Sequence, residues 1–159
     1  MIDLIIFGMY GTLVGYNTLL VSRNGLYEFL QKHTDKKVVV ATNNYSSLEI
    51  EEHLRVLGIR NHILKYYSWN DMIIVHGHSS KRKNLLGICQ EMGVSPERAV
   101  LIVDNEKDID DARIFHVPYV QVPYYEKKGE HFSFMQIDLD KRFSHLDLSK
   151  ANVPKLQER

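Results

Sequence analysis

The chain has 159 residues, 44% of them hydrophobic, and its 20 basic residues balance 20 acidic residues to a formal net charge of zero. This length predicts one well-packed domain, and the charge balance excludes an electrostatic argument for binding nucleic acid or a membrane surface. No basic and apolar leader and no apolar run of transmembrane length is present, so we expect a cytoplasmic protein.

Short apolar runs alternate along the chain with segments of helical periodicity. The apolar runs predict strands, and they cover residues 2–7, 38–41, 63–67, 72–75, 100–103 and 117–122. Apolar residues three and four positions apart predict helices that begin near Ser22, Ser46 and Lys81, and a further helix over about 109–115. This alternation predicts an α/β domain with a mainly parallel sheet of about five strands flanked by helices.

The alternation of strands and helices ends near residue 124. We therefore divide the chain into a core domain over 1–124 and a C-terminal extension over 125–159. Within the extension, residues 132–139 are expected to form an added strand, and 150–159 a polar tail.

Polar side chains follow three of the predicted strands. They are Tyr10 and Thr12 after the first strand, Thr42 and Asn43 after the second, and Asp104 and Asn105 after the strand over 100–103. Ligands of an open parallel sheet bind beyond the carboxyl ends of its strands, so these side chains are expected to share one site. Taken singly, each also has a plain structural explanation, as a turn hydroxyl, a turn amide or a helix cap.

The order of these segments resembles the four motifs of the haloacid dehalogenase (HAD) superfamily. Residues 2–13, IDLIIFGMYGTL, resemble its first motif, a hydrophobic strand followed by Asp, any residue, Asp or Tyr, Gly, Thr and Leu. Thr42 ends the second strand as the second motif requires, and Asp104 begins an Asp-x-x-x-Asp-x-x-x-Ala pattern like the fourth. The resemblance covers residues 2 to about 122 and implies a three-layer, Rossmann-like HAD domain.

The third motif of the family is a lysine that stabilises phosphoryl charge. Lys81 and Lys83 are both candidates, and the expected start of the helix favours Lys81. Without the family context, this Lys-Arg-Lys run is a solvated helix start. Asp110 and Asp111, which follow the fourth motif, are interpreted as an acidic first helical turn.

The resemblance implies Mg²⁺-dependent hydrolysis of phosphomonoesters through an aspartyl-phosphate intermediate. The positions it implies for catalysis are Gly8 for the nucleophile, Tyr10 for the general acid/base, and Lys81. For phosphate binding they are Thr12, Thr42, Asn43 and Lys81, and for Mg²⁺ they are Asp104, Asp108 and the backbone carbonyl of Tyr10.

Gly8 departs from the family motif, because the family has its aspartate nucleophile at this position. The change removes the nucleophile and one metal carboxylate together, so we expect activity to be absent or impaired and Mg²⁺ binding to be weakened. Tyr10 has precedent in haloalkanoic acid dehalogenases, although an unperturbed phenol titrates near pH ~10 and is a poor general acid/base. Val103 is a further departure, since the family usually has Gly before the aspartate of its fourth motif.

Three functions stay open on the sequence. The first is an HAD-like phosphohydrolase that has lost its nucleophile, whether Gly8 is natural or introduced. The second is a non-catalytic pseudoenzyme that binds a phosphorylated or protein partner through Thr42, Asn43 and Lys81. The third and weakest is a 2-haloacid dehalogenase. The segments where the family inserts a cap are short here, which predicts an open site suited to a macromolecular substrate or to an oligomer whose neighbour closes the cleft. The missing cap also argues against dehalogenation.

Overall fold

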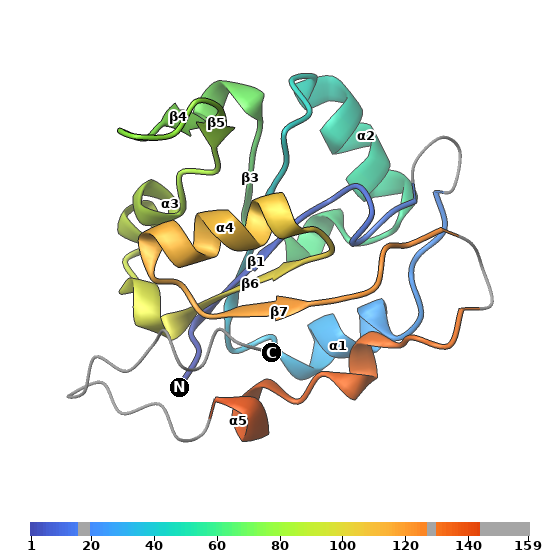
Figure 1. The fold of residues 1–159 in the computed structure, drawn as a ribbon. Coiled ribbons are helices and arrows are strands. Elements are labelled where there is room, and N and C mark those ends of the chain that lie inside the picture. Colours follow the sequence, from blue (N-terminus) through green and yellow to red (C-terminus); the bar gives the residue numbers. More distant parts are fainter. Residues whose placement is uncertain (16–19, 127–129, 144–159) are drawn as a thin grey trace.

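The structure is a computed structural model that describes residues 1–15, 20–126 and 130–143. Strands and helices alternate along most of this length (Figure 1). The strands are β1 (Leu4–Phe7), β2 (Lys37–Ala41), β3 (Lys65–Tyr67), β4 (Ile73–Ile74), β5 (Lys81–Arg82), β6 (Ala99–Val103) and β7 (Tyr119–Gln121). The α-helices are α1 (Leu26–Lys32), α2 (Ser47–Val56), α3 (Leu85–Met92), α4 (Glu106–Phe115) and α5 (Leu139–Arg142).

A parallel sheet of five strands forms the central layer, in the order β3-β2-β1-β6-β7. β1 is the middle strand, and its Leu4 lies opposite Lys37 of β2 and Ala99 of β6. Every residue of β1 and β6 is buried, as expected of apolar runs covered on both faces. The predicted α/β fold with a parallel sheet of about five strands is confirmed.

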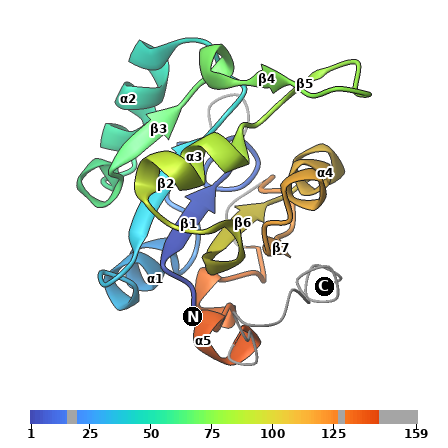
Figure 2. The ribbon, with the colours of Figure 1, turned by 90° about the vertical axis from the view of Figure 1, so that its left-hand side faces the viewer.

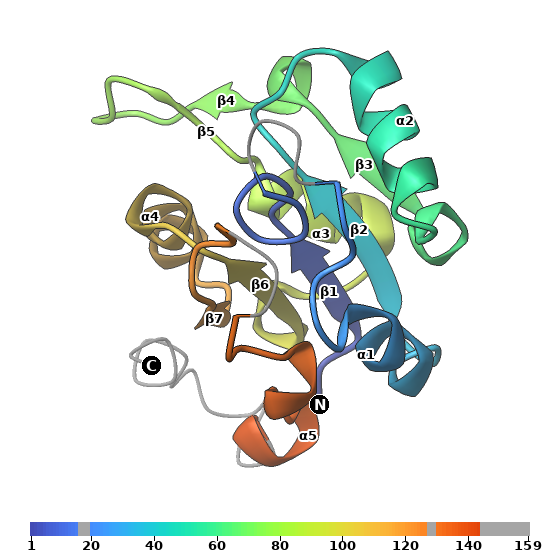
Figure 3. The ribbon, with the colours of Figure 1, turned by 90° about the vertical axis from the view of Figure 1, so that its right-hand side faces the viewer.

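Helices cover both faces of the sheet and complete three layers (Figures 2 and 3). The core on one face contains apolar residues of α1, α2 and α5, and the core on the other contains those of α3 and α4. On the first face, the Phe7 ring packs edge-on against Phe29 of α1 and against Phe134, with ring centroids 6.1 and 5.8 Å away. On the second, Cys89 of α3 is buried. Alternate residues of each strand therefore supply separate cores. Among the described residues, no helix is long and apolar enough to cross a membrane.

Two of the predicted helix starts are wrong. The helix expected from Ser22 begins instead at Leu26, after Gly25, whose φ of 73° lies in the left-handed region that glycine tolerates. The helix expected from Lys81 begins at Leu85, because the Asn84 side chain accepts the Gly87 backbone N–H and caps the helix there. The third expected start is confirmed, since the Ser46 hydroxyl accepts the backbone N–H three residues later, at the start of α2.

The strand expected over residues 132–139 is also wrong. This segment forms a 3-10 turn over Phe134–Gln136 and then enters α5. Ser133 and Asp138 accept backbone N–H groups from Met135 and Lys141, and such local bonds favour a helical turn over a strand. Phe134, Leu139 and Phe143 lie in the same core as α1. The polar tail expected over 150–159 lies outside the described residues.

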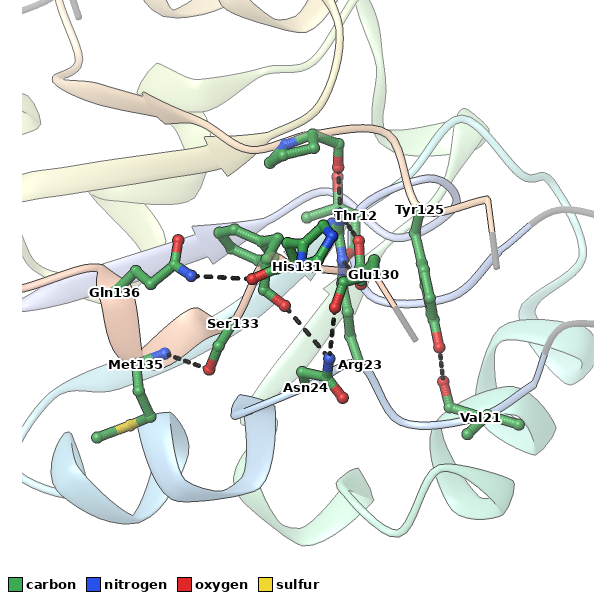
Figure 4. A network of polar contacts seen from close by, with 12 residues as sticks. Thr12, Val21, Arg23, Asn24, Tyr125, Glu130, His131, Ser133, Met135 and Gln136 are labelled. Atoms are coloured by element: carbon green, nitrogen blue, oxygen red, sulfur yellow. Dashed lines mark hydrogen bonds and ion pairs between the residues drawn. The ribbon is translucent and has the colours of Figure 1, made fainter. Parts of the chain in front are cut away.

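Arg23 ties the C-terminal segment to the rest of the domain (Figure 4). Its side chain is fully buried, and its guanidinium donates to both carboxylate oxygens of Glu130, at 2.7 and 2.9 Å. It also donates to the backbone carbonyls of Thr12, at 3.0 Å, and Pro123. One side chain thus joins the loop after β1, the segment after β7 and the chain that leads to α5.

Candidate functional site

A cavity of about 340 Å³ lies at the carboxyl ends of the strands, where the chain order reverses about β1. This is the position at which open parallel sheets bind ligands. Five of the residues predicted for the site line it together, namely Tyr10, Thr42, Asn43, Asp104 and Asp108. A larger and more open hollow of about 610 Å³ lies beside Arg55 and Arg60, but these arginines are paired with Glu51.

Position 8 is tightly packed against the side chains of Val103 and Thr12. A β-carbon added to Gly8 would lie 3.0 Å from Val103 Cγ1 and 3.1 Å from Thr12 Oγ1. Optimal carbon–carbon contacts are about 3.5–4.0 Å, so a side chain at position 8 would require the Val103 side chain and the Thr12 hydroxyl to shift by a few tenths of an ångström. Val103 is fully buried at the end of β6. Gly8 and Val103, the two residues at which the sequence departs from the motif that it resembles, therefore lie against each other.

The Tyr10 hydroxyl is hydrogen-bonded to two residues that follow β2. Asn44 Nδ2 lies 3.0 Å from it and His53 Nδ1 lies 2.8 Å from it. Asn44 Oδ1 accepts the Ser46 backbone N–H while its Nδ2 donates to Glu49, and this fixes the orientation of the Asn44 amide. The Tyr10 oxygen therefore accepts from Asn44, and the tautomer of His53 sets which of Tyr10 and His53 donates in the second hydrogen bond. His53 is a site neighbour that the sequence did not reveal, since the pair is 43 positions apart.

Thr12 and Asp104 join the loop after β1 to the end of β6. The fully buried Thr12 hydroxyl donates to Asp104 Oδ1 at 2.8 Å. Gly11 permits this approach, because its φ is 88° and a β-carbon there would lie 2.6 Å from Asp104 Oδ2. The cap of α4 is Asn105, whose Oδ1 accepts the Asp108 backbone N–H. The Asp104 carboxylate is thus not used as a helix cap, and it lines the cavity.

Of the two candidate lysines, Lys83 is the one that lines the cavity, together with Lys107 of α4. The Lys83 side chain is 6% exposed, and its Nζ lies 2.8 Å from Asp108 Oδ1. Lys81 lies instead in the β4–β5 hairpin, and its Nζ is 4.8 Å from the centre of the Trp69 ring. The placement of Lys81 in the site is therefore wrong. Because α3 starts four residues later than expected, Lys83 is the lysine next to the helix cap.

The donor set is incomplete for the Mg²⁺ site that the resemblance implies. Mg²⁺ takes oxygen ligands in octahedral geometry, usually one or two carboxylates with several waters. Asp104 is suited to this role, but Asp108 Oδ1 is paired with the Lys83 ammonium and its Oδ2 accepts from Asn105. Position 8 supplies no carboxylate, and the described residues contain no group of three or more His, Cys, Asp or Glu that could hold a metal. The residues do not fit the full metal site, and Mg²⁺ stays an expectation of the resemblance.

Comparison with solved structures places the chain in a known fold. A scan of protein-family models and a search of curated proteins matched nothing. CbbY from Rhodobacter sphaeroides in complex with phosphate is similar at 14% identity with a TM-score of 0.62, over 84% of this chain and 92% of that one. A haloacid dehalogenase-like hydrolase from Streptococcus pneumoniae is similar at 12% identity with a TM-score of 0.61, over 80% and 88%.

A third similar structure is an HAD-superfamily hydrolase of subfamily IA from Geobacter sulfurreducens, at 14% identity with a TM-score of 0.61, over 82% of this chain and 96% of that one. At these identities the likeness concerns the fold. The chain therefore has the Rossmann-like fold of HAD hydrolases, and its function has to be argued from its own site.

Proposed function

We propose that this chain is a binding domain on an HAD-like fold, which holds the phosphoryl group of a phosphorylated ligand and does not hydrolyse it. The observation that carries the proposal is the packing of Val103 against Gly8. Loss of a covalent nucleophile alone costs several orders of magnitude in rate. Here Val103 also packs closely against position 8, which favours a site suited to glycine over an enzyme with one residue exchanged.

The phosphoryl group would bind at the carboxyl end of β2, opposite Lys83. Thr42 Oγ1 accepts the Asn44 backbone N–H at 3.2 Å, so the hydroxyl proton of Thr42 remains to donate to an anion. Asn43 lines the cavity beside it and adds an amide donor. Lys83, which is paired with Asp108, and Lys107 bring positive charge to the cavity lining, and charge-assisted hydrogen bonds of this kind are roughly twice as strong as neutral ones.

The open rim of the cavity favours a ligand larger than a free phosphate ion. Between β3 and α3 the chain forms the short β4–β5 hairpin instead of a helical cap. A ligand whose phosphoryl group projects from a larger molecule could therefore reach the strand ends. The same openness argues against a dehalogenase, which has to enclose a small apolar acid.

Isothermal titration with inorganic phosphate tests the proposal, using Lys83→Met and Lys81→Met as a matched pair. Lys83→Met is expected to weaken phosphate binding by about 10- to 100-fold, the equivalent of a lost charge-assisted hydrogen bond. Lys81→Met should bind as the unmodified protein does, because Lys81 packs on Trp69 outside the cavity. Absence of phosphate binding in the unmodified protein, or equal losses in both variants, would contradict the proposal.

The second candidate is a phosphomonoesterase that has lost only its nucleophile. It is favoured by one observation: Lys83, Asp104 and Asp108 line the same cavity, and the Thr12 hydroxyl donates to Asp104. Because Val103 packs closely on position 8, the variants to assay are Gly8→Asp alone and Gly8→Asp combined with Val103→Gly, which removes that contact.

Both variants would be assayed for phosphate release from a generic phosphomonoester with and without Mg²⁺. Mg²⁺-dependent release by the double variant would favour the phosphomonoesterase. No release by either folded variant would favour the binding domain.

A further inference from the structure

We infer that Asp111 is the positioning residue of this site, which fixes the backbone of Lys83 so that the Lys83 ammonium faces the cavity. Nothing in the sequence motifs assigns a role to Asp111. Because the inferred role concerns the binding of a phosphoryl group, it rests on the proposed function.

Asp111 is almost completely buried, and it is bonded to the segment that carries the lysine. It is 1% exposed, and its Oδ2 accepts the Lys83 backbone N–H at 3.1 Å. Its Oδ1 lies 3.4 Å from Nη1 of Arg82, the preceding residue. Arg82 ends β5, and Lys83 lies between β5 and the Asn84 cap of α3. A carboxylate of α4 thus holds the segment at the point where it turns from the hairpin into the helix.

Asp108 and Asp111 hold the same lysine at its two ends. They are three positions apart on α4 and so lie on one face of the helix. Asp108 pairs with the Lys83 Nζ, whereas Asp111 accepts the Lys83 backbone N–H. A lysine side chain has four rotatable bonds, and a contact at its tip alone does not fix the position of its backbone. With both ends held, the ammonium has a defined place beside Asp108 at the cavity wall.

The burial of Asp111 is costly, which argues against a role in simple packing. Desolvation raises the pKa of its carboxyl, and the Lys83 N–H and the nearby cations oppose that rise. An apolar residue would fill this space without the desolvation cost. Lys83 is itself only 5% exposed, so removing the acceptor would leave a backbone N–H that water reaches poorly. We expect the segment to shift in order to satisfy that group, and the ammonium to shift with it.

Three variants at position 111 and one control separate positioning from packing. Asp111→Ala removes the hydrogen-bond acceptor. Asp111→Leu also removes it but fills the space of the side chain, so it replaces the alanine variant if that variant does not fold. Asp111→Asn retains an oxygen that can accept the Lys83 N–H. The control is Asp110→Ala, since Asp110 is the adjacent acidic residue and pairs with Arg113 on the surface.

Two readouts are measured on each folded variant: phosphate affinity by titration calorimetry, and hydrogen exchange of the Lys83 backbone amide by NMR. Asp111→Ala and Asp111→Leu are expected to lower phosphate affinity and to speed Lys83 exchange, each by about tenfold or more. Asp111→Asn should recover most of both, and Asp110→Ala should change neither.

The exchange readout requires no ligand, so the two claims can fail separately. If the unmodified protein does not bind phosphate, the proposed function is wrong, and the exchange rates still report whether Asp111 holds Lys83. If a folded Asp111→Leu variant retains the phosphate affinity and the Lys83 exchange rate of the unmodified protein, Asp111 does not position the lysine and the inference is wrong.

Discussion

Replacing Glu130 by Ala should destabilise the domain strongly, although Glu130 does not line the cavity. Arg23 is completely buried, and Glu130, whose side chain is 15% exposed, is its carboxylate partner. Removing one member of a buried ion pair costs about 3–5 kcal/mol, because the other charge stays buried and uncompensated. We therefore expect Glu130→Ala to lose a substantial part of the stability that a domain of this size has.

The structure favours the lower end of that range. The carbonyls of Thr12 and Pro123 still accept from the guanidinium after the substitution. The rings of Tyr125 and Phe132, with centroids 5.0 and 4.6 Å from the guanidinium carbon, still face the cation. We expect a loss of about 3 kcal/mol, which corresponds to a fall in Tm of roughly 6–12 °C for a domain of this length.

Urea denaturation followed by circular dichroism measures this loss directly. The matched control is Glu126→Ala, because Glu126 is exposed and lies shortly before the same segment. That control should stay within about 0.5 kcal/mol of the unmodified protein. A loss below about 1 kcal/mol for Glu130→Ala, or equal losses in the two variants, would refute the view that Arg23 depends on Glu130.

Two buried titratable groups give the remaining predictions. Burial lowers the pKa of His33, whose Nε2 has no hydrogen-bond partner among the described residues. The unfolded chain therefore binds a proton more readily than the folded one below about pH 6.5. The free energy of unfolding should consequently fall as the pH drops through that value. His33→Phe should flatten the pH dependence of the urea midpoint, and an unchanged pH dependence would contradict the role given to His33. Burial raises the pKa of Cys89 to about 11. Iodoacetamide at pH 8 should therefore modify the thiol of the folded protein far more slowly than that of the urea-unfolded chain. Equal rates would show that the Cys89 thiol is accessible in the folded protein.

The sheet was predictable from the sequence because its inner strands are buried on both faces. Continuous apolar runs such as those of β1 and β6 have few alternative structures in a domain of this length. Polar residues at the ends of those strands then had to meet at one edge, and Thr42 and Asp104 do so. This part of the site follows from topology alone.

The choice between Lys81 and Lys83 could not be made from the sequence. It depends on where α3 starts, and Asn84 decides this through one side-chain bond to the Gly87 N–H. The residues before that cap belong to the β4–β5 hairpin, which has only two residues in each strand and little sequence signal.

The long-range contacts of Asp111 and Arg23 could not be predicted from the sequence either. Asp111 follows Asp110 in an acidic stretch whose sequence predicts a first helical turn. Only the packing of α4 shows that Asp111 is the buried one of the two. Arg23 and Glu130 are 107 positions apart, and no local pattern joins them. The strand expected over residues 132–139 does not form, because side-chain caps within the segment favour helical turns over the strand that its apolar pattern predicts.

A single ³¹P NMR experiment tests the central claim, that this cavity binds a phosphoryl group without hydrolysing it. Phenyl phosphate would be recorded with a stoichiometric amount of the unmodified protein, with and without Mg²⁺, and again with Lys83→Met. We predict that the unmodified protein broadens or shifts the ester signal and that Lys83→Met removes this change. We also predict no signal from inorganic phosphate after prolonged incubation. Growth of an inorganic phosphate signal that requires the unmodified protein, or an ester signal that the protein leaves unchanged, would contradict the account.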